Sequence, residues 1–407
     1  MSKRIAAWVL ACVMAACMCL GAAAETASAG EITIPEITFM YRFDIPDNEA
    51  MAFLKAMGVG WNLGNTFDAN QEGFVARDLN METAWVGVRT SEKLIAAVHD
   101  AGYNTLRLPV SWHNHVSKAD FTINRLWLDR VQEVMDYAIS RGMYVILNIH
   151  HDDGKDFYYP SAEYYDVSAR YITAIWSQLA ERFRDYDEHL IFECINEPRL
   201  KGTDNEWWFD ANSAACVEAA GCINRLNQLF VDTVRASGGN NATRYLMVPG
   251  YDAAPGSAVN GYFALPQDEA DNRIIVSVHA YTPYAFALQD GGTSTFKPAT
   301  TTQSAEIQQF LTALYRTYIS QGVPVVIGEF GARDKKGNLQ ERVNYAAYYT
   351  ASASARNIPC CWWDNGAFTG NGELFGLIKR DTCVWKYPEI VQAMMQYAGY
   401  EKIPVKE

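Results

Sequence analysis

The sequence predicts a (β/α)8 TIM barrel in a single domain, and two features of its pattern carry that prediction. Short apolar runs alternate with longer amphipathic stretches through most of the chain. Near-continuous apolar strands that alternate with helices are typical of a parallel sheet that is covered on its outer face. The chain holds eight such runs, the number that a closed parallel barrel of this kind requires.

These runs and the stretches between them define the expected elements in chain order. The expected strands are Val59–Leu63, Thr105–Pro109, Tyr144–Ile149, Leu190–Ile195, Tyr245–Pro249, Ile274–Val278, Val325–Gly328 and Pro359–Trp363. The expected helices are Ser91–Ala101, Leu126–Arg141, Ala162–Arg184, Cys222–Ala236, Ala305–Gln321, Leu339–Ala355 and Pro388–Tyr397. A doubly wound sheet is the alternative, but no Gly-rich GxGxxG turn follows the first run.

The barrel domain is expected to span residues 45–407. An extension over 25–44 precedes it, and within this region Glu31–Phe43 is expected to add a short strand or a hairpin. No Ser/Thr/Pro-rich linker and no second module is visible in the sequence. The chain is therefore expected to fold as one domain and to act as a monomer.

Residues 1–24 have the pattern of a secretory signal peptide. A short basic start is followed by an apolar run from Ile5 to Leu20, and Ala22–Ala24 supplies small residues for cleavage. We therefore expect a secreted protein. The alternative is a lipid anchor at the cell surface through Cys17, because residues 14–17 loosely resemble a lipobox. No later segment is apolar for long enough to span a bilayer.

Composition narrows the class of partner. The 407-residue chain is 49% apolar and 13% aromatic, which excludes a disordered or collagen-like protein. Its formal net charge of -13 argues against nucleic acid as a partner. The 11 Trp and 23 Tyr residues fit either core packing or a surface on which flat ligands such as sugars stack. We expect a neutral polymer as substrate.

The cysteines give no sign of a metal or cofactor site. No CxxC pair and no Cys/His cluster has the spacing of a zinc site. Cys216 and Cys222 are close enough in sequence for a local disulfide, although spacing alone does not establish one. We expect neither a cofactor nor a structural metal.

Polar residues gather where the predicted strands end, and in a parallel barrel those ends share one mouth. Glu197 follows the fourth strand and Glu329 follows the seventh, so their carboxylates should face each other. Alone, Glu197 could cap a helix and Arg107 could be a buried ion-pair partner, but consecutive strand ends make chance a poor account. The other candidates are Asn65, Arg107, His150, His151, Asn196, His279, Tyr281 and Trp363, with His113 a weaker one.

Seven motifs at these strand ends, taken in order, resemble glycoside hydrolase family 5, and most of all its subfamily 4. They are Gly60–Thr66, Arg107–Val110, Asn148–Asp152, Asn196–Pro198, His279 with Tyr281–Tyr284, Gly328–Gly331 and Trp363–Gly366. The resemblance covers the chain from Val59 onward. Ala280 and Phe67 depart from the family pattern, where Tyr or Trp and Leu are common, and both departures bear on substrate specificity.

The resemblance implies a retaining mechanism with Glu329 as nucleophile and Glu197 as general acid and base. Arg107 and Tyr281 would keep Glu329 ionised, and Glu197 has to hold a proton near neutral pH. His279 would govern that proton. Asn196 is expected to donate to the sugar 2-hydroxyl, His150 and His151 to line one wall, and Trp363 to present its indole face to the sugar. Asn65 and His113 are weaker candidates for sugar hydrogen bonds, whereas Trp362 is expected to pack in the core.

The implied activity is that of an endo-β-1,4-glucanase on cellulose-like β-glucan polysaccharides. A xyloglucanase or a mixed-linkage glucanase on the same machinery is the alternative, and a degenerate carbohydrate-binding barrel is the alternative outside the enzymes. A metal site at His150–Asp153 is a rival for those residues. Candidate stacking residues for further sugars are Tyr158, Tyr159, Trp207 and Trp208.

Overall fold

The computed structural model describes residues 31–37, 40–41, 43–71, 79–298 and 301–403, and the backbone of 405–406. Residues Thr33–Glu407 form one compact unit. The predicted signal peptide and the Cys17 alternative lie outside the described residues.

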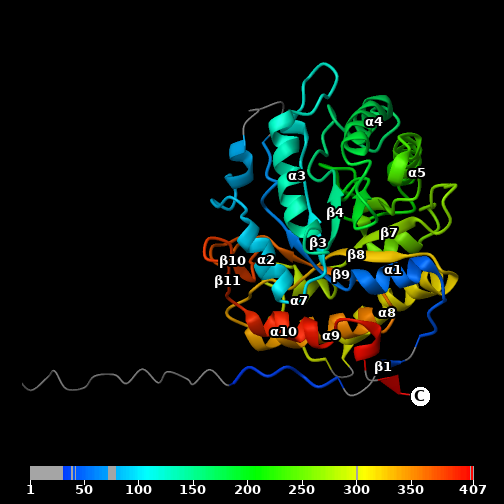
Figure 1. Cartoon of the computed structure of the whole chain (residues 1–407). Helices are drawn as coiled ribbons and strands as arrows, with labels where there is room; N and C mark the ends of the chain where they lie inside the picture. The colour runs from blue at the N-terminus through cyan, green and yellow to red at the C-terminus, as the bar shows by residue number, and fades with distance from the viewer. Residues whose placement is uncertain are drawn as a thin grey trace, which may run out of the picture. The chain divides into compact units, whose positions relative to one another are not determined.

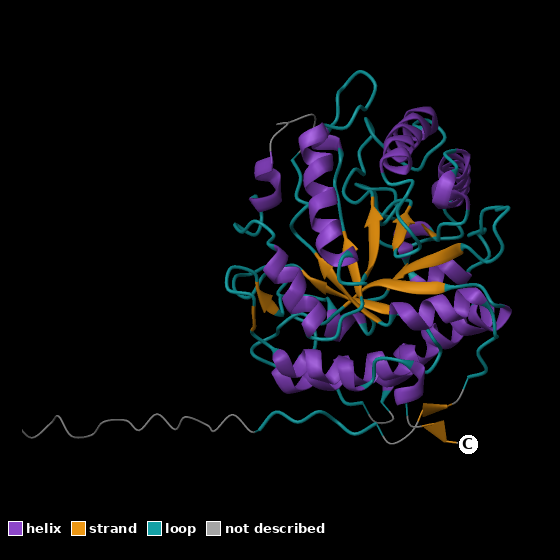
Figure 2. Cartoon of the chain, viewed as in Figure 1, coloured by secondary structure: helices purple, strands orange, loops and turns teal. Residues whose placement is uncertain are grey.

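Eight parallel strands close into a barrel in chain order, as the sequence predicts (Figures 1 and 2). The strands are β2 (Val59–Leu63), β3 (Thr105–Leu108), β4 (Tyr144–Asn148), β5 (Leu190–Glu193), β6 (Leu246–Pro249), β7 (Ile274–His279), β8 (Val325–Phe330) and β9 (Cys360–Asp364). Every residue of these strands is buried, because their inner faces fill the barrel and their outer faces pack against helices. All eight predicted runs are confirmed.

Helices surround the barrel (Figure 2). The long ones are α2 (Glu92–Asp100), α3 (Arg125–Ile139), α4 (Tyr165–Arg182), α5 (Ala214–Ala236), α8 (Thr302–Thr317), α9 (Leu339–Ser354) and α10 (Pro388–Gln396). Each lies where a helix is predicted, but α5 begins eight residues earlier than expected, at Ala214 rather than Cys222. Its first two turns are rich in alanine, a strong helix former with little amphipathic signal, and the Ser213 side chain caps them.

One helix, α1 (Glu49–Met57), was not predicted. The Asn48 side chain caps it by accepting a hydrogen bond from the Met51 amide at 2.8 Å. Its apolar face is buried, including Met51, Leu54 and Met57. At nine residues the helix is too short for a strong periodic pattern.

The described part of the N-terminal extension contains a strand, and the described residues show no hairpin there. Strand β1 (Met40–Tyr41) pairs in parallel with β12 (Val405–Lys406) near the end of the chain. A second small sheet joins β10 (Ile378–Lys379) to β11 (Val384–Trp385). Between β6 and β7 there are only short elements, the 3-10 turn η4 (Tyr251–Ala253) and α6 (Pro255–Val259), so this connection lacks a long covering helix.

Cys216 and Cys222 do not form a disulfide. Both are buried free thiols on α5. Six residues along a helix correspond to a rise of about 9 Å, which is beyond the reach of a disulfide. The remaining described cysteines are also free.

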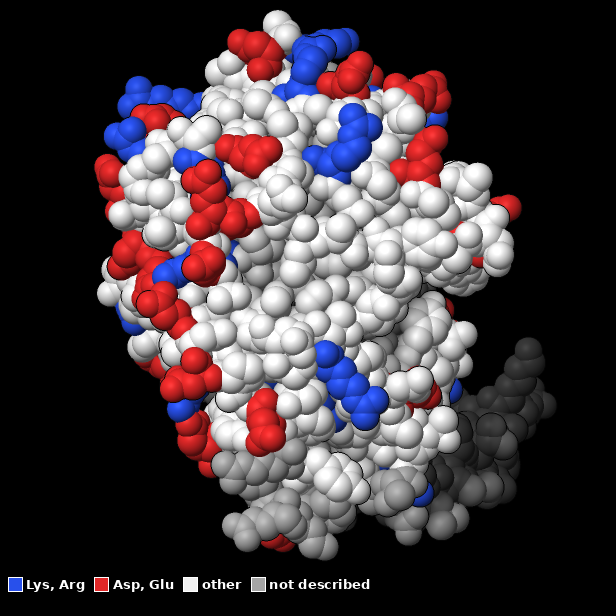
Figure 3. All heavy atoms as spheres, turned by 90° about the vertical axis from the view of Figure 1, so that its right-hand side faces the viewer, with Lys and Arg blue, Asp and Glu red and all other residues white. Residues whose placement is uncertain are grey.

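Two features of the described residues concern membranes and nucleic acids as partners. No helix among the described residues is long and apolar enough to cross a membrane. On the face drawn in Figure 3, basic side chains are scattered among acidic ones, and the described residues of that face form no continuous basic patch.

Candidate active site

The site is organised around Arg107, which lies on β3 inside the barrel and is fully buried. Its Nε donates to Glu193 Oε2 at 2.8 Å, and its Nη1 donates to Glu329 Oε1 at 2.6 Å. Nη1 also donates to Asn62 Oδ1 at 3.0 Å, and Nη2 donates to Asn196 Oδ1 at 2.8 Å. Burial alone would lower the pKa of Arg107, but Glu193 and Glu329 raise it, so the guanidinium stays charged.

Glu329, at the end of β8, is held from two sides. Arg107 binds Oε1, and the Tyr281 hydroxyl donates to Oε2 at 2.8 Å. Burial and the Glu329 carboxylate raise the pKa of Tyr281 well above its usual value, so this hydroxyl keeps its proton. Gly328 is required next to this carboxylate, because a Cβ there would lie 3.0 Å from His279 Nε2 and 3.3 Å from Arg107 Nε.

Glu197 has a different environment, although it lies close to Glu329. The side-chain ligand atoms of Glu197, His279 and Glu329 all lie within 4.8 Å of one another. His279 Nδ1 is 2.8 Å from Glu197 Oε1, and Arg199 Nη1 is 4.0 Å from Oε2. Part of the Glu197 side chain remains exposed at the mouth.

The sequence analysis expects Glu197 to hold a proton near neutral pH, but in the structure the proton is shared with His279. Burial would raise the pKa of Glu197, but the hydrogen bond and charge of His279 lower it below its usual value. Burial would likewise lower the pKa of His279, but the carboxylates of Glu329, Glu193 and Glu197 raise it to about 9. His279 and Glu197 therefore hold one proton between them, and its share on Glu197 is smaller than expected.

Glu193, inside the barrel on β5, is a site residue that the sequence analysis missed. It is fully buried and accepts hydrogen bonds from Arg107, from Asn148 Nδ2 at 3.1 Å and from Ser277 Oγ at 2.6 Å. Burial would raise its pKa, but Arg107 and His279 lower it to about 2. The available signal was a lone carboxylate within an apolar strand, because a buried charge requires a partner.

His150 and Trp363 form one wall of the mouth. Their rings are nearly parallel, at 3° with centroids 5.7 Å apart. Burial lowers the pKa of His150 well below its usual value, so the ring is neutral. Gly64 makes room for this wall, because a Cβ there would lie 2.8 Å from the Trp363 ring.

His151 and Asn65 lie farther out on the same side. The half-exposed His151 is 3.8 Å from Asp68 Oδ2, and its ring faces the exposed Trp85 at 5.9 Å between centroids. Asn65 is half-buried, and its backbone amide donates to Asp68 at 3.0 Å. Trp85 is an aromatic neighbour that the sequence analysis did not select.

The two aspartates of the rival metal site are engaged elsewhere. Asp152 accepts hydrogen bonds from the backbone amides of Trp112 and His113, and Asp153 pairs with Arg199 at 3.2 Å and with Lys201 at 2.9 Å. A different trio, Asp68, His150 and His151, has ligand atoms within 4.8 Å of one another.

This trio is poorly prepared for a metal. Asn148 Nδ2 lies 3.0 Å from His150 Nδ1, and an amide N–H can only donate. Nδ1 of the neutral ring is therefore the acceptor, and Nε2 carries the hydrogen, which blocks the lone pair that a metal would need.

Three further predictions on side chains have mixed outcomes. His113 is buried between Asp152 and the Gln71 carbonyl, so it supports the loop and is not free for a sugar. Tyr158 and Tyr159 are buried, which makes them wrong as stacking candidates. Trp362 is buried and donates to the Phe375 carbonyl at 3.1 Å, which confirms its packing role.

Trp207 and Trp208 are exposed as expected for stacking residues, at 59% and 65%. They lie on the loop between β5 and α5. The Trp207 ring packs over the Arg199 guanidinium, 4.3 Å from its centroid. Arg199 in turn contacts Glu197, so this loop joins an aromatic surface to one of the two carboxylates.

Comparison with known proteins identifies the family of this site. The family described as cellulase (glycosyl hydrolase family 5) matches residues 67–369. The chain belongs to glycoside hydrolase family 5.

Individual members of family 5 resemble the whole barrel. A GH5 lichenase structure from Caldicellulosiruptor sp. F32 is 55% identical with a TM-score of 0.88, covering 90% of this chain and 99% of that one. A GH5-4 broad specificity endoglucanase from Ruminococcus champanellensis, with bound cellotriose, is 44% identical with a TM-score of 0.79, covering 87% of this chain and 100% of that one. Endoglucanase 1 of Ruminococcus albus is 44% identical over 347 residues, which are 85% of this chain and 80% of that protein.

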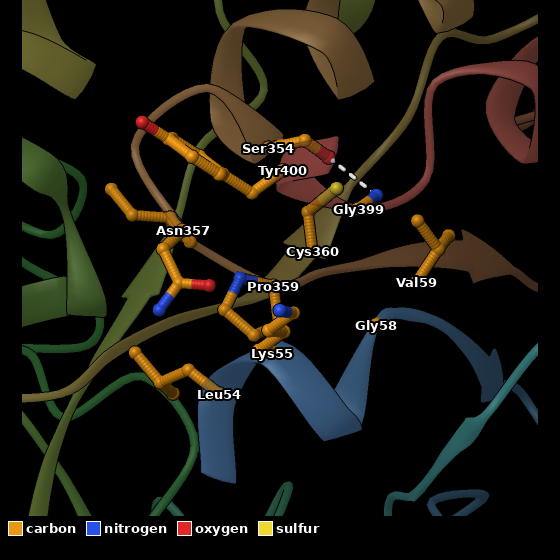
Figure 4. Close-up of a pocket in the computed structure, with 11 residues that line it drawn as sticks. Leu54, Lys55, Gly58, Val59, Ser354, Asn357, Pro359, Cys360, Gly399 and Tyr400 are labelled. Atoms are coloured by element: carbon orange, nitrogen blue, oxygen red, sulfur yellow. Dashed lines mark hydrogen bonds between the residues drawn. The ribbon is translucent and has the colours of Figure 1, made fainter. Parts of the chain in front are cut away.

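A second pocket lies at the opposite end of the barrel, where the strands begin. It is lined by residues at the start of β2 and β9, including Val59 and Cys360, and by Leu54 and Lys55 of α1 (Figure 4). In TIM barrels the active site lies at the other end, where the strands finish. We therefore assign this pocket to the structural base of the barrel.

Proposed function

We propose that this family 5 enzyme is a secreted, retaining endo-β-1,4-glucanase, with Glu329 as nucleophile and Glu197 as general acid and base. The observation that carries the proposal is the proximity of these carboxylates, whose facing oxygens lie within 4.8 Å. Retaining glycosidases have carboxyl groups about 5 Å apart, whereas inverting enzymes need about 6.5 Å or more to admit a water.

In the first step Glu329 attacks the anomeric carbon and the glycosidic C–O bond breaks. Arg107 and Tyr281 hold both oxygens of Glu329, which keeps the carboxylate ionised and fixes its direction. The proton of the His279–Glu197 pair passes from Glu197 to the departing oxygen. Seating the sugar excludes water from the pair, and this desolvation favours the neutral carboxyl over the ion pair.

In the second step water releases the sugar from Glu329. The ester carries no charge, so Glu197 no longer faces an anion and its pKa falls, which suits a base. Glu197 takes a proton from the water, the water oxygen attacks the anomeric carbon, and Glu329 leaves as a carboxylate. Two inversions give net retention at the anomeric carbon.

Asn196 is oriented for the 2-hydroxyl of the sugar. The Arg107 guanidinium can only donate, so the Asn196 oxygen must face it, and the amide NH2 remains for the substrate. A hydrogen bond to the 2-hydroxyl strengthens in the transition state of these enzymes. The neutral His150, stacked parallel to Trp363, supplies a flat wall for the same sugar.

The endoglucanase relatives support β-1,4-glucan as the substrate class. A second candidate is mixed-linkage β-glucan, because two structures of the Caldicellulosiruptor lichenase share 55% and 54% of their residues with this chain. A xyloglucanase on the same machinery also stays open.

The test is hydrolysis of carboxymethylcellulose, barley β-glucan, xyloglucan, xylan and mannan, with and without a chelator. We expect a fast loss of viscosity on the glucans, unchanged by the chelator, and a β-configured product in the first NMR spectra. An α-configured first product would contradict the retaining mechanism. Absence of activity on every polymer would favour the degenerate binding barrel.

Secretion rests on the sequence pattern of residues 1–24. The intact mass of the exported protein distinguishes a form cleaved after Ala24 from a form that is lipid-anchored through Cys17. Cleavage after Ala24 is the expected result, and a lipid-modified N-terminal Cys17 would support the anchored alternative. A monomer is expected from light scattering of the same sample.

A further inference from the structure

The strand end after β6 contributed no residue to the predicted site, yet it places the carboxyl group of Asp252 in a turn that is bonded to the loop carrying Glu197. Asp252 lies in the turn η4 (Tyr251–Ala253), three residues after the last residue of β6. The structure gives three independent observations about this residue, which concern its backbone, its attachment and its side chain.

The backbone of the turn is strained. Asp252 has a φ of 55° and a ψ of 17°, and Ala253 has a φ of 47°. Left-handed conformations cost residues other than glycine free energy, and they persist where surrounding contacts hold them. Two such residues in succession indicate that the position of this turn is fixed from outside.

The contacts that hold the turn come from the loop that carries Glu197. The Asp252 amide donates to the Pro198 carbonyl at 2.8 Å, directly after Glu197 in the chain. The Tyr251 hydroxyl accepts from the Leu200 amide at 3.0 Å and donates to the Asn205 carbonyl at 2.6 Å. The turn that carries Asp252 is therefore anchored by three hydrogen bonds to the loop that follows Glu197.

The Asp252 side chain is prepared for a proton. Its Oδ1 is buried, and no described residue offers it a hydrogen bond. Burial and the Glu197 carboxylate raise the pKa of Asp252 to about 8. The other charged groups that act on it are Glu206, which also raises the pKa, and Arg199 and His279, which lower it.

We propose that Asp252 is a positioning residue for the proton of Glu197, and that its charge extends the acid form of Glu197 to higher pH. The proposal rests on the assignment of Glu197 as the general acid. At neutral pH Asp252 is uncharged, so it does not oppose the Glu197 anion that forms when the glycosidic bond breaks. In alkaline solution Asp252 ionises, and the repulsion between the carboxylates keeps the proton on Glu197.

The test compares wild type with Asp252→Asn across pH. Asparagine accepts the left-handed backbone but carries no charge. We expect similar kcat/KM at pH 6, and an alkaline limb of kcat/KM that moves to lower pH by about one unit. Asp252→Glu keeps a carboxyl group, so its alkaline limb should lie between those of Asp252→Asn and wild type. Asp232→Asn is the matched control, because this exposed aspartate on α5 contacts Gln228 instead of the site.

Two further measurements keep the result decisive. Asp252→Gly relieves the backbone strain, so it should be more thermostable than Asp252→Asn while its alkaline limb shifts by the same amount. Difference infrared spectra of wild type and Asp252→Asn should show one carboxyl that titrates near pH 8 in wild type alone.

The outcomes separate this proposal from the proposed function. An unshifted alkaline limb in both variants, or the absence of the titrating carboxyl, would overturn the role of Asp252. A wild type that hydrolyses no glucan but shows the titrating carboxyl would instead overturn the glucanase assignment and, with it, the role of this carboxyl in catalysis.

Discussion

The two ends of the same eight strands have opposite characters. At the mouth, Arg107, Glu193 and Glu329 form a buried charged network whose members come from β3, β5 and β8. At the base, Val59 and Cys360 begin β2 and β9, and the Asn357 amide donates to the Met51 carbonyl at 2.9 Å. The comparison teaches that the mouth holds costly polar groups for chemistry and the base contributes stability.

The largest expected effect comes from Glu329→Ala at the mouth. If Glu329 is the nucleophile, as we propose, no glycosyl ester can form without it, and the hydrolysis rate of a β-cellobioside with a good leaving group should fall by about 10⁴-fold or more. Circular dichroism and thermal unfolding should show an intact fold. Activity close to wild type would contradict the assignment of Glu329.

Azide provides the matching control for this variant. It can enter the space that the Glu329 side chain vacates and attack the anomeric carbon in a single inversion. We expect partial recovery of the rate and an α-glycosyl azide as product. A β-glycosyl azide would indicate that another residue still acts as the nucleophile.

The next effect is a loss of stability that comes from the mouth, although the base is the end that we assign to stability. Arg107→Leu removes the partner of Glu193, which is fully buried, and removal of one member of a buried ion pair destabilises a protein by about 3–5 kcal/mol. Urea unfolding at pH 7 measures this loss. The double variant Arg107→Leu/Glu193→Leu should regain part of the stability, and a double variant less stable than the single one would contradict the pairing.

A smaller effect follows from the pKa of Glu193. Its folded-state pKa of about 2 lies below the ordinary value of 4.5, so its contribution to stability is present above pH 4.5 and is lost as the pH falls toward 2. Between pH 4 and pH 2 the stability of wild type should fall by up to about 1.4 kcal/mol per pH unit more steeply than that of Glu193→Gln. Equal slopes would show that Glu193 is not strongly paired.

How far the sequence predicts this molecule depends on the kind of contact. The eight strands and both carboxylates follow from local patterns, because an apolar run marks a buried strand and a parallel barrel gathers all strand ends at one mouth. The same logic correctly gathers Arg107, Asn196, His279 and Tyr281 around Glu329 and Glu197.

What the sequence did not predict depends on partners far away in the chain. Tyr158 is as aromatic as Trp207, but one is buried and the other exposed, which only the packing of the loops decides. Asp252 looks like an ordinary turn residue, but its pKa is raised by burial and by Glu197, which lies 55 positions earlier in the sequence. The pKa of Glu197 is also lowered, where the sequence led us to expect it raised, because His279 on β7 contacts its carboxyl group.

The smallest effect tests the base of the barrel. Asn357, labelled in Figure 4, is buried with a φ of 56°, a conformation that asparagine tolerates better than alanine. Its side-chain amide donates to the Met51 carbonyl of α1. Asn357→Ala should lower the free energy of unfolding by about 1–2 kcal/mol, with kcat/KM on barley β-glucan unchanged. Asn357→Gly, which accepts the backbone but lacks the hydrogen bond, should lose less. A fall in kcat/KM for either variant, measured well below its melting temperature, would show that the base is coupled to the mouth and would break the comparison.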